Sequence, residues 1–180
     1  DTSERGDVAL DEAPADLDTF KVASPRVDAD SEKFARLLPE DPPKSITLRA
    51  EMISRNVRKR METVPAVGNQ TASVALDAGK GNSTEQSLVL VAALRHHEIA
   101  ARFVSGAKLD ENGEFIAHQW VQYWDGTKYW SDVDPTTETM LPGNDQIQLF
   151  THPEPEQPAL APFLAAAKIE RMTADVEPGQ

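Results

Sequence analysis

Three short motifs in the middle of the chain hold the residues best suited to chemistry. The first, Gly81–Gln86, reads Gly-Asn-Ser-Thr-Glu-Gln and leads into a strongly apolar segment of helical character. Ser83 can cap that helix through its hydroxyl group, and Gln86 can complete a capping box three residues later. The same position suits a nucleophile, because the positive end of a helix stabilises a thiolate. On spacing alone, both interpretations of Ser83 stay open.

The other two motifs belong to one predicted β-hairpin. His118 lies on its first strand, Asp132 and Asp134 lie on the returning strand, and Asp125-Gly126 predicts the turn. A two-residue loop would point both aspartates away from the face that carries His118. A loop with an odd number of residues, or a bulge, would bring one of them onto that face. The hairpin can therefore form a His–Asp pair, but parity does not choose between the two aspartates.

Sequence periodicity predicts the elements that position these motifs. Helices are expected where apolar residues recur every three or four positions, and strands where β-branched and aromatic residues gather. The predicted helices are 31–38, 47–63 and 83–97, and the predicted strands are 99–109, 115–124 and 128–133. Helices followed by an antiparallel meander make an α+β fold, with the buried helix 83–97 packed on the sheet.

Charge and proline content divide the chain into three parts. Residues 1–30 are acidic and are predicted to form a mostly extended N-terminal segment. Residues 31–150 form the predicted folded domain. Residues 151–180 are predicted to be a Pro-rich linker with a short C-terminal helix over 159–172. The two ends carry −6 and −3 of the net charge of −12, so the folded part is close to neutral.

The composition of the 180-residue chain argues against several classes of protein. The chain has no cysteine, which removes disulfides, cysteine-based metal sites and a thiol nucleophile. Its net charge of −12 argues against nucleic acid and anionic membrane surfaces as partners. His96-His97-Glu98 is predicted to be a solvated end of a helix, because adjacent helical side chains diverge and do not share one metal ion. Neither a metal nor a cofactor is predicted.

Together the three motifs resemble the transglutaminase-like superfamily. In that family Gly-Asp-Cys-Thr-Glu-His leads into an apolar helix, followed by Gly-Ile-Pro-Ala-Arg-x-Val-x-Gly, His-x-Trp and Trp-x-x-x-Asp-Pro-Thr. The matching segments here are Gly81–Gln86, Ile99–Gly106, His118–Trp120 and Trp130–Thr136, in the same order. The resemblance covers about residues 47–137 and implies a papain-like fold, in which a nucleophile at a helix N-terminus meets a His and an Asp from neighbouring strands.

The resemblance also implies roles for individual residues. Ser83, His118 and Asp134 occupy the three catalytic positions, which leaves Asp132 as an ordinary strand residue. The predicted binding residues around them are Asn82, Gln86, Trp120 and Trp124.

The departures from the family pattern lie in the motif that carries the catalytic nucleophile. Ser83 replaces the cysteine, Asn82 the aspartate and Gln86 the histidine of the first motif. A serine hydroxyl is far less acidic than a thiol and is not stored as an anion beside an imidazole. We therefore predict a pseudoenzyme, not an enzyme, that binds a peptide or protein partner. Three alternatives are an active cysteine transamidase or protease with an engineered Cys-to-Ser change at position 83, a working Ser-His-Asp enzyme, and a purely structural spacer ectodomain.

A cellular setting follows from the same resemblance. Inactive members of the family occur as extracytoplasmic domains fused to seven transmembrane helices, in bacterial envelope systems associated with ATP-grasp peptide ligases. Acidic segments at both ends suit an ectodomain of a larger membrane protein. We therefore predict a periplasmic or extracytoplasmic domain that meets a membrane only through flanking segments. A functional link to an ATP-grasp peptide ligase is expected, and a nucleic-acid partner is not.

Overall fold

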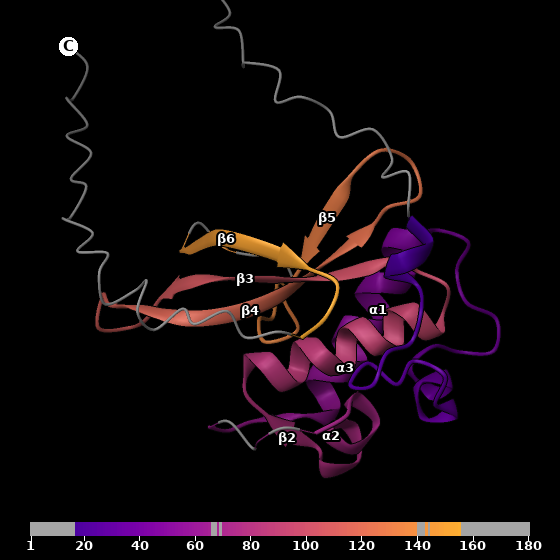
Figure 1. The fold of residues 1–180 in the computed structure, drawn as a ribbon, viewed down its shortest axis with the longest axis horizontal. Helices are drawn as coiled ribbons and strands as arrows, with labels where there is room; N and C mark the ends of the chain where they lie inside the picture. Colours follow the sequence, from indigo (N-terminus) through magenta and orange to yellow (C-terminus); the bar gives the residue numbers. More distant parts are fainter. Residues whose placement is uncertain (1–16, 66–67, 69, 140–142, 144, 156–180) are drawn as a thin grey trace, which may run out of the picture.

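The computed structural model describes residues 17–65, 68, 70–139, 143 and 145–155 (Figure 1). Its helices are η1 (Leu17–Phe20), η2 (Glu32–Leu37), α1 (Ile46–Arg60), α2 (Ala72–Ala78) and α3 (Ser83–His96). Its strands are β1 (Glu62–Thr63), β2 (Lys80–Gly81), β3 (Ala101–Leu109), β4 (Phe115–Trp124), β5 (Trp130–Val133) and β6 (Gln146–His152). The predicted α+β class is confirmed.

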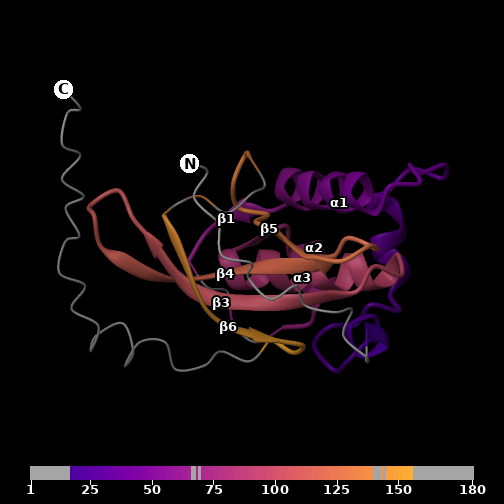
Figure 2. The ribbon, with the colours of Figure 1, turned by 90° about the horizontal axis from the view of Figure 1, so that it is seen from above.

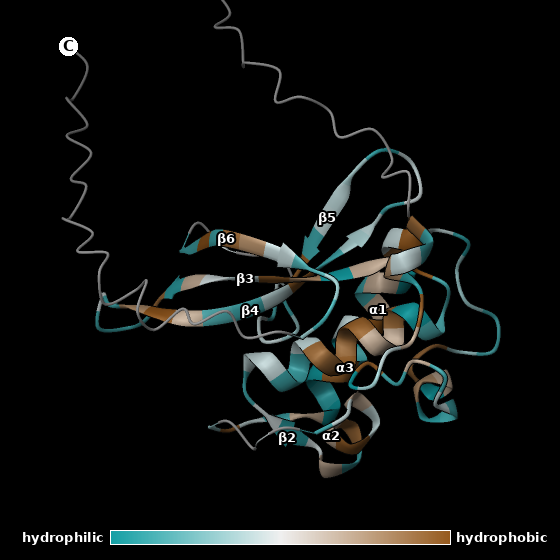
Figure 3. Ribbon diagram, viewed as in Figure 1, coloured by the Kyte–Doolittle hydropathy of each residue, from teal (hydrophilic) through white to brown (hydrophobic). Residues whose placement is uncertain are grey.

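Helix α3 lies at the centre of the fold. Its residues from Glu85 to Arg95 are all buried, and the seven consecutive apolar residues Leu88–Leu94 give the middle of the helix its hydrophobic colour (Figure 3). The sheet of β3, β4, β5 and β6 packs along α3, while α1, α2 and η2 pack around its remaining surface (Figure 2). The N-terminus of α3 is therefore held rigidly next to the sheet. Among the described residues, no helix is long and apolar enough to cross a membrane.

The sheet is antiparallel, with the strand order β5-β4-β3-β6. Strands β3 and β4 form a long central hairpin, in which Ala101 pairs with Tyr123 and Leu109 with Phe115. Strand β6 pairs along the other side of β3, and its register shifts between Ser105 and Gly106. The two short strands β1 and β2 pair in parallel just before α3 begins.

The two edge strands of the sheet approach each other across one of its faces. Strands β5 and β6 are separated by β4 and β3, which would place them about 14 Å apart in a flat sheet. The amide of Gln122 on β4 nevertheless donates to Asp132 on β5 at 3.0 Å and to Gln148 on β6 at 3.1 Å. The sheet is therefore strongly curled. Because side chains alternate along a strand, the enclosed face is the one that carries His118.

The turn between β4 and β5 is longer than the two residues Asp125-Gly126 that mark it in the sequence. Strand pairing ends at Trp124 and Trp130, so the loop has five residues, 125–129. The carboxylate of Asp125 accepts three backbone N–H hydrogen bonds from this loop, at 2.8, 3.0 and 3.2 Å, which stabilise its longer path. The odd loop length places Asp134 on the same face as His118, as the parity of the hairpin required.

Residues near both predicted domain boundaries take part in the fold. Val27 and Ala29, in the segment predicted to be mostly extended, are buried in the core. Strand β6 continues to His152, past the predicted end of the domain at residue 150. The boundaries themselves stay predictions, and the predicted helix over 159–172 lies outside the described residues.

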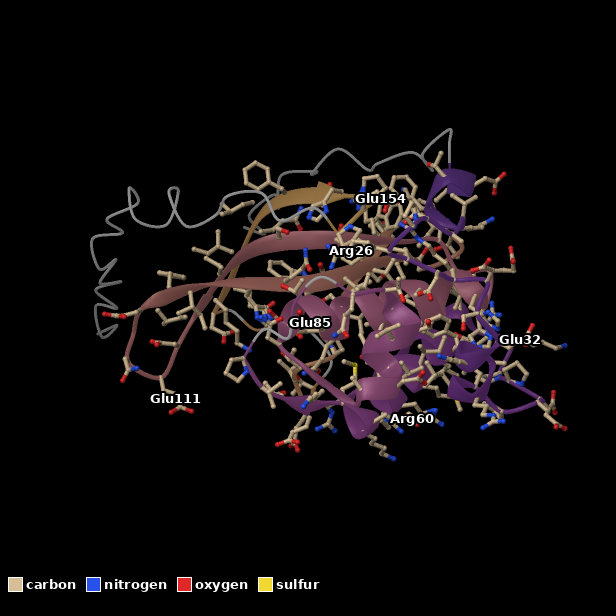
Figure 4. The ribbon with its side chains drawn as sticks, turned by 60° about the horizontal axis from the view of Figure 1, so that its bottom comes forward. Arg26, Glu32, Arg60, Glu85, Glu111 and Glu154 are labelled. Atoms are coloured by element: carbon tan, nitrogen blue, oxygen red, sulfur yellow. The ribbon has the colours of Figure 1, made fainter. Side chains whose placement is uncertain are left out.

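The buried side chain of Arg95 ties these boundary segments to α3. Its guanidinium donates to the carbonyl oxygens of Val22 at 3.0 Å, of Ala101 at 3.0 Å and of Pro153 at 2.5 Å. Burial lowers the pKa of Arg95 to about 10, and the nearby carboxylate of Glu154 acts in the opposite direction, so the side chain remains charged at neutral pH. Arg26 and Glu154 lie close together on this side of the molecule (Figure 4). Arg26 donates to the carbonyl of Pro155 at 3.2 Å, which adds a second tie.

Candidate active site

Ser83 is the first residue of α3, but its neighbours cap the helix. The side chain of Asn82 accepts the backbone N–H of Thr84 at 2.8 Å, and the carboxylate of Glu85 accepts that of Asn82 at 2.9 Å. The capping interpretation of Ser83 and Gln86 is therefore wrong, because Asn caps a helix as well as Ser and stands one residue earlier. The hydroxyl of Ser83 stays available for chemistry at the positive end of α3.

The hydroxyl of Ser83 lies against β4, next to His118. The backbone N–H of Gln119 donates to Oγ of Ser83 at 3.4 Å. One turn along α3, Oγ of Ser87 donates to the carbonyl oxygen of Gln119 at 3.0 Å. Strand β5 pairs with β4 only from Val121 onward, so the backbone of Gln119 is free to meet α3 instead. These two contacts hold the N-terminus of α3 beside the strand position that follows His118.

His118 and Asp134 form a buried hydrogen-bonded pair. Nε2 of His118 lies 2.8 Å from Oδ2 of Asp134, and the two side chains are 8% and 0% exposed. The other carboxylate oxygen accepts the backbone N–H of Thr136 at 2.9 Å and its hydroxyl at 2.7 Å. Burial raises the pKa of the Asp134 carboxyl, but the contacts with His118 and Thr136 outweigh burial and hold the pKa below its ordinary value. Asp134 is therefore ionised at neutral pH.

The ionised carboxylate fixes the tautomer of the imidazole. A carboxylate only accepts hydrogen bonds, so Nε2 of His118 must carry the proton that it shares with Asp134. In the neutral ring, Nδ1 is then the nitrogen with a free lone pair. A hydroxyl, an oriented imidazole and a buried carboxylate are the parts needed to activate a weak nucleophile by general-base catalysis.

Asp132, the second aspartate of the hairpin, contacts Trp120 instead of His118. Its Oδ1 accepts the indole N–H of Trp120 at 2.8 Å and the amide of Gln122 at 3.0 Å. The indole stacks on the imidazole of His118, with ring centroids 6.1 Å apart and an angle of 25° between the planes. The structure thus answers the question that hairpin parity left open. Each aspartate has its own partner, and Asp132 holds the ring that packs on His118.

The four predicted binding residues are mostly structural. Asn82 is the helix cap, and Trp120 is only 2% exposed. Gln86 is fully buried, and its amide donates to Oγ1 of Thr63 at 3.0 Å and to the carbonyl of Gly81 at 3.2 Å. Trp124 is also buried and packs edge-on against Trp130. Gln86 and Trp124 are 0% and 7% exposed, so a direct role of either side chain in ligand binding stays a prediction.

The histidines at the end of α3 are not the solvated pair that was predicted. Both are half-buried, with Nδ1 of His96 2.8 Å from the carbonyl of Ala29 and Nε2 of His97 3.2 Å from that of Phe34. They pack against the segment before α1, which the helical periodicity of α3 did not reveal. No cluster of three or more potential metal ligands occurs within the described part of the chain.

One residue of the site, Gln146, was missed entirely. It is the first residue of β6, and its Nε2 lies 2.7 Å from Oδ2 of Asp134. No sequence motif includes Gln146, and a long loop separates it from Asp134, so the sequence does not indicate the contact. Only the curl of the sheet brings the two residues together.

Comparison with known proteins identifies the family. A family model described as the transglutaminase-like superfamily matches residues 34–135, more than half of the chain. The chain belongs to the transglutaminase-like superfamily. The family resemblance inferred from the motifs is thereby confirmed, and the inactive members with seven transmembrane helices remain only a prediction.

Two solved structures are similar to this transglutaminase-like chain. One is a candidate cysteine protease from Cytophaga hutchinsonii, with a TM-score of 0.63 and 17% identity, covering 81% of this chain and 51% of that one. The other is the periplasmic domain of TgpA from Pseudomonas aeruginosa, with a TM-score of 0.39 and 23% identity, covering 64% of this chain and 43% of that one. The chain thus spans about half the length of these proteins. No curated protein sequence matches it.

The prediction that the chain is not an enzyme must be corrected. The structure from Cytophaga hutchinsonii, which shares the fold, is described as a candidate cysteine protease, so the fold by itself does not make a domain inactive. The prediction rested on the departures from the family pattern at Asn82, Ser83 and Gln86. Around Ser83, the histidine and the aspartate of the family pattern are both in place and hydrogen-bonded to each other.

Proposed function

We propose that this transglutaminase-like domain catalyses acyl transfer on peptides, with Ser83 as the nucleophile. One observation carries the proposal. Oγ of Ser83 accepts a hydrogen bond from the backbone N–H of Gln119, the residue that follows His118, and His118 is buried and hydrogen-bonded to Asp134. A buried His–Asp pair without a chemical role would be an expensive arrangement, because two ionisable groups are removed from water. Its position next to the hydroxyl of a helix N-terminus supports a catalytic role.

The mechanism assigns one step to each side chain. Nδ1 of His118 takes the proton of the Ser83 hydroxyl while Oγ attacks the carbonyl carbon of the peptide. The backbone N–H of Ser83, which has no intrahelical acceptor at the first position of α3, donates to the developing oxyanion. His118 then passes the proton to the departing amine as the carbon–nitrogen bond breaks, leaving an acyl ester on Ser83. Water or a second amine attacks that ester, and Ser83 regains its proton.

Asp134 supports both proton transfers without moving a proton itself. Its Oδ2 accepts the hydrogen bond of Nε2, which leaves Nδ1 free to take the proton of Ser83, and its negative charge stabilises the positive charge that His118 then carries. General-base catalysis of this kind contributes about 100-fold to 10,000-fold to a rate. A serine needs that assistance more than a cysteine does, because it is not stored as an anion. The rate is therefore expected to depend strongly on His118.

Turnover of activated peptide esters and of a glutamine-containing peptide with an added amine tests the proposal. We expect release of the alcohol or of ammonia by the wild-type domain, and no release after Ser83→Ala. Ser31→Ala is the matched control, because the hydroxyl of Ser31 makes no capping hydrogen bond and lies before η2, far from Ser83 in the chain. A wild-type rate equal to that of Ser83→Ala on every substrate contradicts the proposal.

A cysteine at position 83 is the second candidate nucleophile. The position is the first residue of α3, where the helix dipole lowers the pKa of a thiol, and no cap is lost on substitution because Asn82 provides it. Ser83→Cys is therefore expected to raise the rate on peptide esters and to make it sensitive to iodoacetamide. If Ser83→Cys is inert while its fold is unchanged, the site does not accept a sulfur nucleophile.

The setting of the domain is a separate part of the proposal. We propose an extracytoplasmic domain of a larger membrane protein that acts on a peptide or protein ligand, with a functional link to an ATP-grasp peptide ligase. The support is the motif resemblance and the acidic composition of both ends. A fusion of the full-length protein to alkaline phosphatase tests the location, because that reporter is active only outside the cytoplasm. An inactive, stably expressed fusion contradicts it.

A further inference from the structure

The side chain of Gln146 reaches the catalytic carboxylate from the far edge of the sheet. Its Nε2 lies 2.7 Å from Oδ2 of Asp134, the same oxygen that accepts Nε2 of His118 at 2.8 Å. Gln146 is on β6 and Asp134 directly follows β5, and these strands are at opposite edges of the sheet. The contact exists only because the sheet is curled around the face that carries His118.

The chemistry of the partner fixes the orientation of the Gln146 amide. A carboxylate oxygen accepts hydrogen bonds, so the amide must present its NH₂ group to Asp134 and its carbonyl oxygen away from it. The outward-turned Oε1 is buried and finds no partner among the described residues. A buried acceptor left without a partner is unfavourable. The contact with Asp134 is therefore maintained in spite of this cost.

The carboxylate of Asp134 is held on all sides by this arrangement. Oδ1 accepts two hydrogen bonds from Thr136, and Oδ2 accepts one from His118 and one from Gln146. Thr136 is two residues away in the same loop and fixes the carboxylate locally. His118 donates from β4, and Gln146 donates from β6 at the far edge of the sheet. Gln146 is therefore the donor that fixes the carboxylate against β6. Without it, His118 is the one donor from the sheet that still holds Oδ2.

We propose that Gln146 is a positioning residue, which holds Asp134 so that the imidazole of His118 keeps Nδ1 directed toward Ser83. Its importance for turnover rests on the proposed acyl-transfer function, but the positioning itself does not. Misplacement of a catalytic group by about 1 Å reduces a rate by up to about 100-fold. Loss of Gln146 is therefore expected to lower kcat and to leave KM nearly unchanged, since Gln146 contacts Asp134 and not the peptide.

Gln146→Met is the test variant, because methionine has a similar length and lacks the donor. Gln148→Met is the matched control. Gln148 is also on β6, and its amide contacts Gln122 instead of Asp134. The first readout is the ring N–H proton of His118 in the NMR spectrum, assigned by its loss in His118→Gln. We expect this signal to be shifted or broadened by exchange in Gln146→Met and unchanged in Gln148→Met. The second readout is kcat for a peptide ester, which we expect to fall about 10-fold or more only in Gln146→Met.

Each other outcome has a defined meaning. An unchanged His118 signal in a folded Gln146→Met variant overturns the proposal, as does the same change in both variants, which would assign the effect to β6 as a whole. If Gln146→Met does not fold, Gln146→Glu replaces it, with the same expected NMR change because a second carboxylate then faces Asp134. A changed His118 signal in a domain that never turns over peptide esters supports the positioning and refutes the acyl-transfer function.

Discussion

Removal of the Asp134 side chain is the perturbation that bears most directly on the buried pair. In Asp134→Ala, the hydrogen-bond donors of His118, Gln146 and Thr136 lose their acceptor. An unpartnered buried donor costs about 1–3 kcal/mol. His118 is 8% exposed and bears the full penalty, whereas Gln146 and Thr136 are half-buried and can recover part of it from water. Loss of one partner of a buried pair destabilises by about 3–5 kcal/mol. We therefore expect the free energy of unfolding to fall by about 3 kcal/mol.

Urea unfolding at neutral pH, followed by tryptophan fluorescence, measures this loss. Asp132→Ala is the matched control, because Asp132 lies two residues earlier and also accepts two hydrogen bonds, from Trp120 and Gln122. Asp132 is half-buried, so water can replace it, and we expect a loss of only about 1 kcal/mol. Equal losses in the two variants would refute the reasoning, because the greater burial of Asp134 would then have no energetic consequence.

Three further predictions concern stability. The pKa of Asp134 lies below its ordinary value of 3.8, so the stability that Asp134 contributes is present above pH 3.8 and is lost as the pH falls further. The free energy of unfolding should therefore fall more steeply between about pH 5 and pH 2 in the wild type than in Asp134→Asn. Parallel curves for the two proteins contradict this prediction. In Gly106→Ala the new Cβ would lie 2.0 Å from the carbonyl oxygen of Ile147, so we expect a loss of about 1–3 kcal/mol by urea unfolding, and a neutral variant would show that β6 moves away freely. Arg95→Met removes the donors to three carbonyl groups and should lower the midpoint of thermal unfolding, with a loss of about 2–4 kcal/mol; an unchanged midpoint would mean that the boundary segments are held by other contacts.

The elements that could be predicted from the sequence are those with strong local signals. The apolar run of α3 and the alternating residues of β4 were located within one residue of their observed ends. Helix α2 was missed because it has only seven residues between its cap Thr71 and the left-handed Gly79, too few to display a period. Strand β6 was missed because most of its side chains are exposed or half-buried, which removes the hydrophobic alternation.

The site was predictable only where its residues are close in sequence or belong to a motif. Ser83, His118 and Asp134 could be placed by family resemblance, and the parity of the hairpin required the odd loop that the structure has. Asn82 and Ser83 are adjacent and both can cap a helix, so the sequence did not decide that Asn82 is the cap. The contact of Gln146 with Asp134 depends on the curl of the sheet, a property of the packed tertiary structure that no local pattern records.

The central claim is that Ser83 is a nucleophile activated by His118, and detection of an acyl-enzyme tests it most directly. The domain is mixed with an activated peptide ester, quenched in acid and examined by intact-mass and peptide mass spectrometry. We expect one added acyl group, located on Ser83, and none in Ser83→Ala or His118→Ala. An adduct that persists in Ser83→Ala, or the absence of any adduct together with the absence of turnover in the folded wild-type domain, would contradict the claim.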